Sequence, residues 1–168
     1  MSKSTKSVTM KDGITTNSAN IKYFTKEFQL KRHHKTDAGY DIHADTSSPV
    51  TINSGQFKTI DTEVIIQLPN DVEAQIRPRS GLASKLGITV LNSPGTIDPG
   101  YRGKIKVVLI NHGPEPYTFN RGDAIAQVVF QKLSNIESIK VNTEKDLNYD
   151  TIRKDSGFGS TDAKQKGS

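Results

Sequence analysis

The chain has 168 residues, a net charge of +5 and no cysteine, and a chain of this length is expected to form one domain that buries about 70% of its unfolded surface. The absence of cysteine excludes a disulfide framework, a thiolate metal site and a cysteine nucleophile. No apolar run approaches the roughly 18 residues that span a bilayer, and the N-terminus has no hydrophobic signal region, so we expect a soluble, intracellular protein.

Residues 1–20 are rich in Ser, Thr, Lys and Asn without any period, which predicts a disordered extension. The one tight basic cluster follows at 31–35 and contains the adjacent histidines His33 and His34. Neighbours in an extended chain point to opposite faces, so a solvated cluster fits these histidines better than a metal site. Because no stretch interleaves dense basic residues with aromatics, we expect no stable nucleic-acid binding, and the positive charge can equally steer a small polyanion.

Short segments suited to β-strands follow one another, with turn signals such as 53–55 and 69–71 between them. Their spacing, without alternating helices, predicts an all-β sandwich, jelly roll or barrel. Gly39 would allow close approach of the backbone, and Asp41 is suited to a cap or a turn. The predicted strands are 21–24, 28–30, 49–52, 56–60, 63–68, 72–77, 88–91, 104–111, 117–119, 124–133 and 136–141.

One helix is predicted over 77–87, with Ser80 as its N-cap and Gly87 as its end. The backbone N–H groups after Ser80 and the guanidinium of Arg79 favour a bound phosphate. An ordinary capped helix with a surface arginine fits the same residues, so the sequence pattern leaves both interpretations open.

A hairpin is predicted over 91–111, with polar residues in the connection between its strands. Pro99 and Gly100 suit the central positions of a type II turn, which would bring Asp98 close to Tyr101. An unpaired Asp98 carboxylate could orient a water molecule and accept its proton. Alternatively, Asp98 bonds its own backbone in an Asx-turn.

The predicted strand 124–133 is apolar except for the amide of Gln127, which must find partners in neighbouring backbone or in a ligand. A tight turn explains the Arg-Gly-Asp sequence at 121–123 better than an adhesion motif does. The polar, acidic segment 142–154 is typical of a flexible linker. It leads to 153–161, which combines a cation, glycines and an aromatic ring, as a loop that closes on a ligand requires.

Five segments in order resemble the motifs of the trimeric dUTPases. They are Ala-Gly-Tyr-Asp-Ile (38–42), Pro-Arg-Ser-Gly-Leu-Ala (78–83), Gly-Thr-Ile-Asp-Pro-Gly-Tyr-Arg-Gly (95–103) with Asn92 upstream, Arg-Gly-Asp-Ala-Ile-Ala-Gln (121–127), and Arg153 followed by Gly-Phe-Gly-Ser-Thr (157–161). Each motif is short, and their shared order carries the resemblance. In the last motif Lys154, Ser156 and Asp162 replace glycines of the family, which predicts slower or weaker closure of that loop.

The resemblance implies a distorted jelly-roll β-barrel with one short helix and a mobile C-terminal arm. The β domain would span 21–141, after the disordered extension, and the arm 142–168 would carry the Gly-rich lid motif. A homotrimer would hydrolyse dUTP to dUMP and pyrophosphate with Mg²⁺, which limits uracil in DNA and supplies dUMP for dTMP synthesis. The location would be the cytoplasm, or the interior of a host cell if the protein is viral.

The family's site residues map onto this chain motif by motif. Asp98 would accept the proton of the attacking water, Gln127 and Arg153 would assist catalysis, and Asp41 would hold water of the bound magnesium. Each pocket would take the hairpin from one subunit, the phosphate-binding segments from a second and the tail from a third. The substrate-binding residues implied are Arg79, Ser80, Gly81, Asn92, Gly95, Ile97, Tyr101, Lys104, Phe158, Gly159, Ser160 and Thr161.

Two alternative functions have different signatures. The related dCTP deaminases place a catalytic glutamate on the strand after the hairpin, and 104–111 contains no glutamate. A nucleotide-binding regulatory protein with a protein partner would keep the pocket and use the unusual termini for binding.

Overall fold

The computed structural model describes residues 20–151, in which eleven strands, one α-helix and one short 3-10 helix form. The helix α1 is Ser80–Leu86, and the 3-10 helix η1 is Glu144–Asp146. The strands are β1 (Lys22–Phe24), β2 (Gly39–His43), β3 (Val50–Ile52), β4 (Phe57–Asp61), β5 (Ile65–Gln67), β6 (Val72–Arg77), β7 (Ile88–Val90), β8 (Gly95–Ile97), β9 (Lys106–Asn111), β10 (Tyr117–Phe119) and β11 (Ala124–Lys132).

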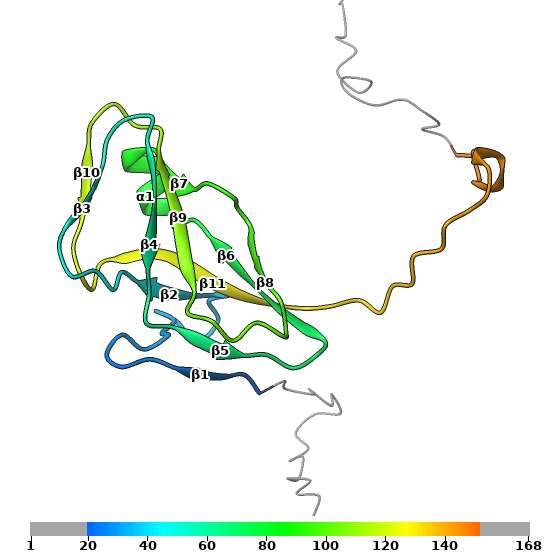
Figure 1. The fold of residues 1–168 in the computed structure, drawn as a ribbon, viewed down its shortest axis with the longest axis horizontal. Helices are drawn as coiled ribbons and strands as arrows, with labels where there is room; N and C mark the ends of the chain where they lie inside the picture. The colour runs from blue at the N-terminus through cyan, green and yellow to red at the C-terminus, as the bar shows by residue number, and fades with distance from the viewer. Residues whose placement is uncertain (1–19, 152–168) are drawn as a thin grey trace, which may run out of the picture. The chain divides into compact units, whose positions relative to one another are not determined.

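All strand pairs in this part of the chain are antiparallel, and they form two larger sheets and two ribbons (Figure 1). One larger sheet has the order β2-β11-β6-β8, and the other has the order β4-β9-β7. The ribbons are β1-β5 and β10-β3. Their inward-facing aliphatic residues, such as Ile42, Leu109 and Val128, form one buried core, which confirms the all-β prediction.

The sequence pattern missed β2 and β8 and placed two strands where none forms. Residues 28–30 lie outside any strand, as do residues 136–141. In the latter segment, Ile136, Ile139 and Val141 are spaced by three and then two residues, so their side chains cannot share one face of a strand. Ile136 and Ile139 are both about four-fifths exposed, at 81% and 79%.

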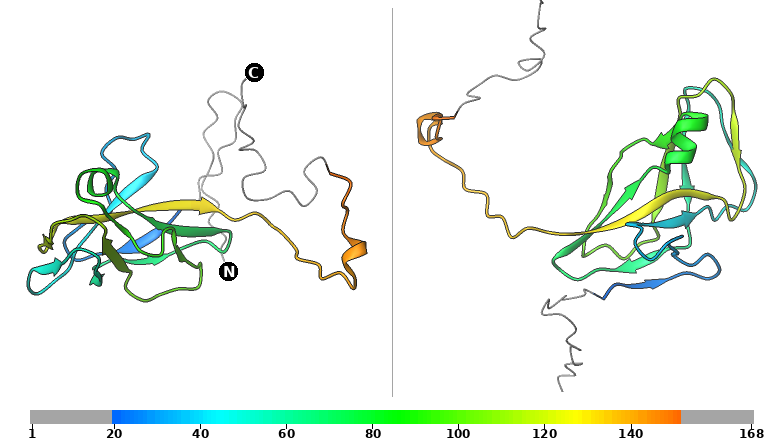
Figure 2. Two further views of the ribbon diagram at one scale, coloured as in Figure 1. Left: turned by 90° about the horizontal axis from the view of Figure 1, so that it is seen from above. Right: turned by 180° about the vertical axis from the view of Figure 1, so that it is seen from behind.

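Strand β11 crosses the body between β2 and β6 and carries a β-bulge (Figure 2). Ala124 pairs with His43 and Ala126 with Ile42, so Ile125 is an extra residue on β11. A bulge of this kind shifts the phase of the side chains that follow it. Ala126 and Val128 consequently face the core, whereas Gln127 lies on the opposite face of the sheet.

The described residues fall into two compact units, 20–134 and 135–151, which we describe separately. The second unit contains η1, which Thr143 and Asp146 cap reciprocally, and the Tyr149 hydroxyl donates to Glu144 Oε1 at 2.7 Å. Within residues 20–151, no helix is long and apolar enough to cross a membrane.

Candidate active site

Three strands of the four-stranded sheet bring polar side chains into one row. Gln127 of β11 lies opposite Asp41 of β2 on one side and opposite Arg77 of β6 on the other. Directly opposed residues of antiparallel strands place their side chains on the same face. The row therefore forms the polar face of a sheet whose other face packs in the core.

A pocket of about 400 Å³ opens over this row, at the end of the sheet that carries α1. Arg79 lies between β6 and α1, and its guanidinium holds Asp41 through both carboxylate oxygens, with Nε–Oδ1 at 3.2 Å and Nη2–Oδ2 at 3.3 Å. Its Nη1 donates to the carbonyl oxygen of Ala124 at 3.1 Å. The pocket is lined by His33, Asp41, Arg79, Ser80, Gly81, Leu82, Lys85, Leu86 and Gln127.

The helix beside the pocket begins at Ser80, inside the predicted segment 77–87 but one residue before an N-cap at Ser80 would place its start. Arg79, not Ser80, is the N-cap residue, in extended conformation, and no side chain caps the helix. Pro78 disfavours helical geometry at Arg77, which therefore remains in β6. Gly87 ends the helix in left-handed conformation with φ 67°, as predicted. Arg79 is thus free of the helix and can direct its guanidinium toward Asp41.

Gln127 is fixed from two directions. Its Nε2 donates to the carbonyl oxygen of Pro78 at 2.9 Å, which holds the amide beside the start of α1. A Cβ atom added at Gly39 would overlap the Gln127 carboxamide. Gly39 is therefore needed for the position of Gln127, which agrees with the predicted close approach at this residue.

We expect Gly39→Ala to displace the Gln127 amide from the pocket, since the added methyl group occupies its place. Loss of one hydrogen bond to a bound substrate would lower kcat/KM about tenfold. The control is a double-mutant cycle: in a Gln127→Ala background the overlap with the carboxamide is gone and only the 3.2 Å contact with the Cβ of residue 127 remains, so Gly39→Ala should add little. Additive losses in the cycle would show that Gly39 acts independently of Gln127.

The first and last strands of the predicted hairpin pair with each other, whereas the short strand between them pairs outside the hairpin. β7 and β9 pair antiparallel, with Ile88 opposite Asn111, whereas β8 lies between them in sequence and pairs with β6. The turn after β8 is closed by Tyr101 N–H donating to the Asp98 carbonyl oxygen at 3.0 Å. Gly100 does not have the positive φ that a type II turn requires, so the predicted turn type is wrong.

The Asp98 side chain is exposed and makes no hydrogen bond or ion pair with residues 20–151. The Asx-turn alternative is therefore wrong. The neighbouring Tyr101 is 43% exposed, and its hydroxyl donates to the Lys104 carbonyl oxygen at 2.9 Å. Its ring lies so close to Gly103 that an added Cβ there would overlap it.

Asn92 lies against the start of β8. A Cβ built at Gly95 would come 3.2 Å from Asn92 Nδ2, which is tighter than an ordinary contact. Ile97, at the end of β8, is half-buried opposite Ala74. The hairpin thus gathers Asn92, Gly95, Ile97, Asp98, Tyr101 and Lys104 along one connection of the chain.

Within a single chain the hairpin and the pocket are separate. None of the hairpin residues lines the pocket. Ile97 pairs with Ala74, and β6 must continue three residues to Arg77 before the chain reaches Arg79, which is about 10 Å along a strand. Figure 1 shows α1 and the β8–β9 connection toward opposite ends of the body. Asp98 and Asp41 therefore do not line one pocket within this chain.

Some predicted site residues lie outside the described part of the chain, namely Arg153, Phe158, Gly159, Ser160 and Thr161. Conversely, His33 and Lys85 line the pocket without having been predicted as site residues. Lys85 lies about one helical turn after the middle of the motif at 78–83, and this spacing could have predicted it as a residue of the pocket. His33 belongs to the basic cluster at 31–35, and only the fold reveals that this cluster reaches the pocket.

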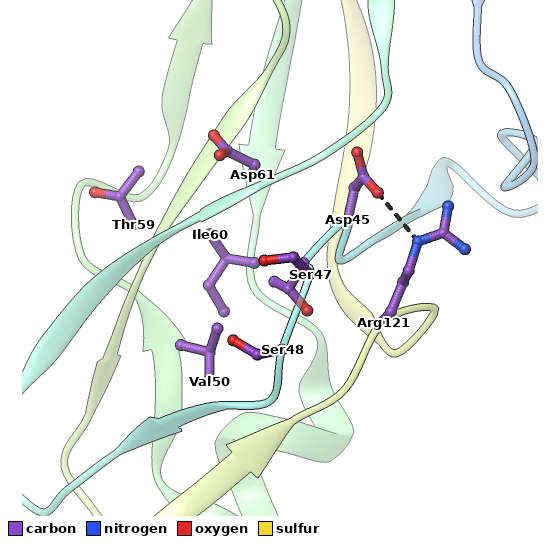
Figure 3. A pocket seen from close by; sticks show the side chains of 9 residues that line it. Asp45, Ser47, Ser48, Val50, Thr59, Ile60, Asp61 and Arg121 are labelled. Carbon is purple, nitrogen blue, oxygen red and sulfur yellow. Dashed lines mark hydrogen bonds and ion pairs between the residues drawn. The ribbon is translucent and has the colours of Figure 1, made fainter.

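A second and larger pocket, of about 560 Å³, is lined by the loop after β2 and by β4 (Figure 3). Asp45 and Asp61 contribute its carboxylates, but Asp45 is paired with Arg121 at 3.2 Å and Asp61 with Lys106 at 3.1 Å. The lining is rich in hydroxyl groups and contains no residue that the sequence motifs mark as catalytic. The pocket's charges are thus already neutralised within the chain.

Arg121 is the centre of an ion-pair cluster, although its side chain is 42% exposed. It contacts Glu27 at 2.7 Å and the buried carboxylate of Glu63 at 3.1 Å, besides Asp45. These partners raise the pKa of Arg121, led by Glu27. Gly122 follows with φ 88° in a turn closed by Asp123 N–H to Asn120 O, which confirms the predicted tight turn.

Two other ionisable groups have shifted pKa values. Backbone N–H groups, first that of Glu27, stabilise the Glu63 carboxylate and lower its pKa. Burial lowers the pKa of His43, against the smaller opposing effect of the Asp41 carboxylate.

Comparison with known proteins identifies the class. A family model described as dUTPase matches residues 27–162. The deoxyuridine 5'-triphosphate nucleotidohydrolase of Rickettsia bellii is 44% identical over 150 residues, covering 88% of this chain and 97% of the relative. That of Neorickettsia sennetsu is 45% identical over 137 residues, covering 81% and 89%.

Solved structures show the same fold. A variant dUTPase of Staphylococcus bacteriophage 80alpha with dUpNHpp superposes with a TM-score of 0.71 at 24% identity, covering 87% of this chain and 99% of that one. Native EIAV dUTPase gives a TM-score of 0.63 at 26% identity, covering 74% and 98%. The β fold with its one short helix is thus a dUTPase fold. The chain belongs to the dUTPase family.

Proposed function

We propose that this chain is a dUTP diphosphatase that hydrolyses dUTP to dUMP and pyrophosphate. The observation that carries the proposal is the polar row of Asp41, Gln127 and Arg77 beneath a pocket that also holds Arg79 and Ser80. Arginine forks and amide donors are well suited to phosphate oxygens. The Rickettsia bellii relative carries the name of this enzyme, and the match covers 97% of its length.

In this proposal the triphosphate enters the 400 Å³ pocket. Arg79 turns part of its guanidinium from Asp41 to a phosphate, and the Ser80 hydroxyl and Gln127 amide bind further oxygens. A Cβ at Gly81 would meet no atom within 4 Å, so the backbone there faces open space. These donors would stabilise the charge that shifts toward pyrophosphate. Arg153 and the segment 157–161 would add donors from the tail.

Magnesium fits this pocket as an ion bound mainly through substrate and water. No group of three or more His, Asp or Glu residues that could hold a metal occurs within residues 20–151. Asp41 is the single carboxylate lining the pocket, and Mg²⁺ commonly uses one or two carboxylates together with substrate phosphates. Asp41 would hold the ion through water, and the ion would neutralise phosphate charge.

Asp98 is proposed as the base that accepts the proton of the attacking water. Its free carboxylate is held at a closed turn, so it has no competing partner within residues 20–151. Asn92 and the β8 backbone would read uracil and exclude a 5-methyl group. Tyr101 would pack under the deoxyribose and exclude a 2′-hydroxyl.

A homotrimer would unite these groups. None of the hairpin residues, Asp98 included, lines the phosphate pocket of its own chain. Joining the hairpin of one subunit to the pocket of a second, and the tail of a third, would complete each site.

The test of the activity is a substrate panel. Pyrophosphate release from dUTP, dTTP, dCTP and UTP is measured with Mg²⁺ and with EDTA. We expect release from dUTP alone at substantial rates, and only with Mg²⁺. Ammonia release from dCTP would instead support a deaminase, and binding without turnover would support a regulatory protein.

We expect Tyr101→Ala to increase turnover of UTP relative to dUTP, because the ring that excludes the 2′-hydroxyl is removed. The matched control is Tyr101→Phe, which loses the hydrogen bond to Lys104 O but keeps the ring. Steady-state kcat/KM for both nucleotides gives the ratio. If Tyr101→Ala weakens turnover of both nucleotides equally, the ring has a packing role and does not exclude the 2′-hydroxyl.

A further inference from the structure

The basic cluster at 31–35 lies beside the proposed phosphate pocket and contributes His33 to its lining. Its chain is attached to β2 by Asp41 N–H donating to the Lys31 carbonyl oxygen at 2.9 Å. The Arg32 guanidinium lies 5.0 Å from the centroid of the Tyr40 ring and donates to Asp37 O at 3.2 Å. The basic cluster therefore has a defined position relative to Asp41.

A closed turn sets the direction of His33. The Asp37 carboxylate accepts the His34 N–H at 2.7 Å, and Asp37 N–H donates to His34 O at 3.1 Å. The turn directs His33, but not His34, into the pocket lining. His33 Nε2 lies 3.1 Å from Asp41 Oδ2, and since a carboxylate only accepts, the imidazole donates.

Asp41 thus has two side-chain partners among residues 20–151, Arg79 and His33. The proposed function draws the Arg79 guanidinium toward a phosphate, which weakens its hold on Asp41. His33 is then the remaining side chain that fixes the rotation of the carboxylate. A group that orients a carboxylate near a metal affects metal affinity without touching the metal.

We infer that His33 is a positioning residue that holds Asp41 in the orientation required for magnesium-dependent binding of the triphosphate. This inference rests on the proposed function of the same pocket. The His33 side chain is 75% exposed, so it has little packing role, and its removal should act on Asp41 alone.

The test compares His33→Ala with His34→Ala in the full-length chain. His34 is the neighbouring histidine of the same cluster and lies outside the pocket lining. Binding of a non-hydrolysable dUTP analogue is measured by calorimetric titration with Mg²⁺ and with EDTA. Mg²⁺ dependence of dUTP turnover is measured in parallel.

We expect His33→Ala to weaken analogue binding about tenfold in the Mg²⁺ arm, with no change in EDTA or in the thermal unfolding midpoint. The Mg²⁺ concentration for half-maximal turnover should rise correspondingly. His34→Ala should match the wild type. His33→Gln, whose amide can also donate to Asp41, should restore part of the loss.

Each other outcome is decisive. If His33→Ala and His34→Ala bind alike in Mg²⁺, or if His33→Ala loses as much in EDTA as in Mg²⁺, the positioning role is overturned while the proposed function stands. If the wild type neither binds the analogue nor hydrolyses dUTP, the proposed function fails, and this inference fails with it.

Discussion

Asp98→Asn should lose most dUTP turnover while keeping nucleotide binding and stability. The amide preserves the shape of the side chain but cannot accept the water proton, and a positioned base typically contributes about 10²–10⁴ in rate. The Asp98 carboxylate makes no hydrogen bond or ion pair with the part of the chain that the structure describes. The substitution should therefore leave the thermal unfolding midpoint unchanged.

The measurements are pyrophosphate release and calorimetric titration with a non-hydrolysable dUTP analogue. Asp71→Asn is a matched control, because the Asp71 side chain is also exposed and its carboxylate forms one exposed ion pair, with Lys132 at 3.6 Å. Near-normal turnover by Asp98→Asn would refute the assignment of the base. Loss of analogue binding would mean that the carboxylate binds substrate instead.

The second large effect is recovery of activity in mixed trimers. Asp98→Asn and Arg79→Ala homotrimers should each be nearly inactive, since every pocket lacks one group. When the two variants are refolded together, a pocket is complete if it takes intact Asp98 from one chain and intact Arg79 from another. Random mixing of equal amounts gives about one complete pocket in four.

Recovery to about a quarter of wild-type turnover is therefore expected, by the same random-mixing estimate. Size-exclusion chromatography with differently tagged chains verifies that the trimers are mixed. A further control mixes Asp98→Asn with the double variant Asp98→Asn/Arg79→Ala, and this mixture should recover nothing. Verified mixed trimers as inactive as their parents would show that each site is built within one chain.

Local sequence patterns predicted most of the strands, because their apolar and β-branched residues alternate over a few positions. They missed β2 and β8, since Gly39 and Gly95 open these strands and lower their apparent β-propensity. Those glycines are present because Gln127 and Asn92 lie against them. The close packing at these two positions thus obscures the strand pattern.

The N-cap was misplaced by one residue. Ser80 resembles an N-cap, but Arg79 has the extended backbone of the cap, and no side chain caps the helix. The motif order predicted Arg79, Gln127 and Asp41 as site residues, and all three line one pocket. The approach of His33 to Asp41 depends on the turn at 34–37, and no pattern in the sequence specifies that turn's direction.

The bulge at Ile125 has a consequence for protein engineering. Alternation counted from the start of β11 puts Gln127 on the core side, whereas alternation counted from its end puts it on the pocket side. A redesign that regularises this strand for stability by pairing every residue in turn from Ala124, with Ile125 kept but no longer bulged, would reverse the half that follows Ala124. The amide would then compete with aliphatic side chains for the interior, and a sheet improved by geometric criteria would lose the polar row on its other face.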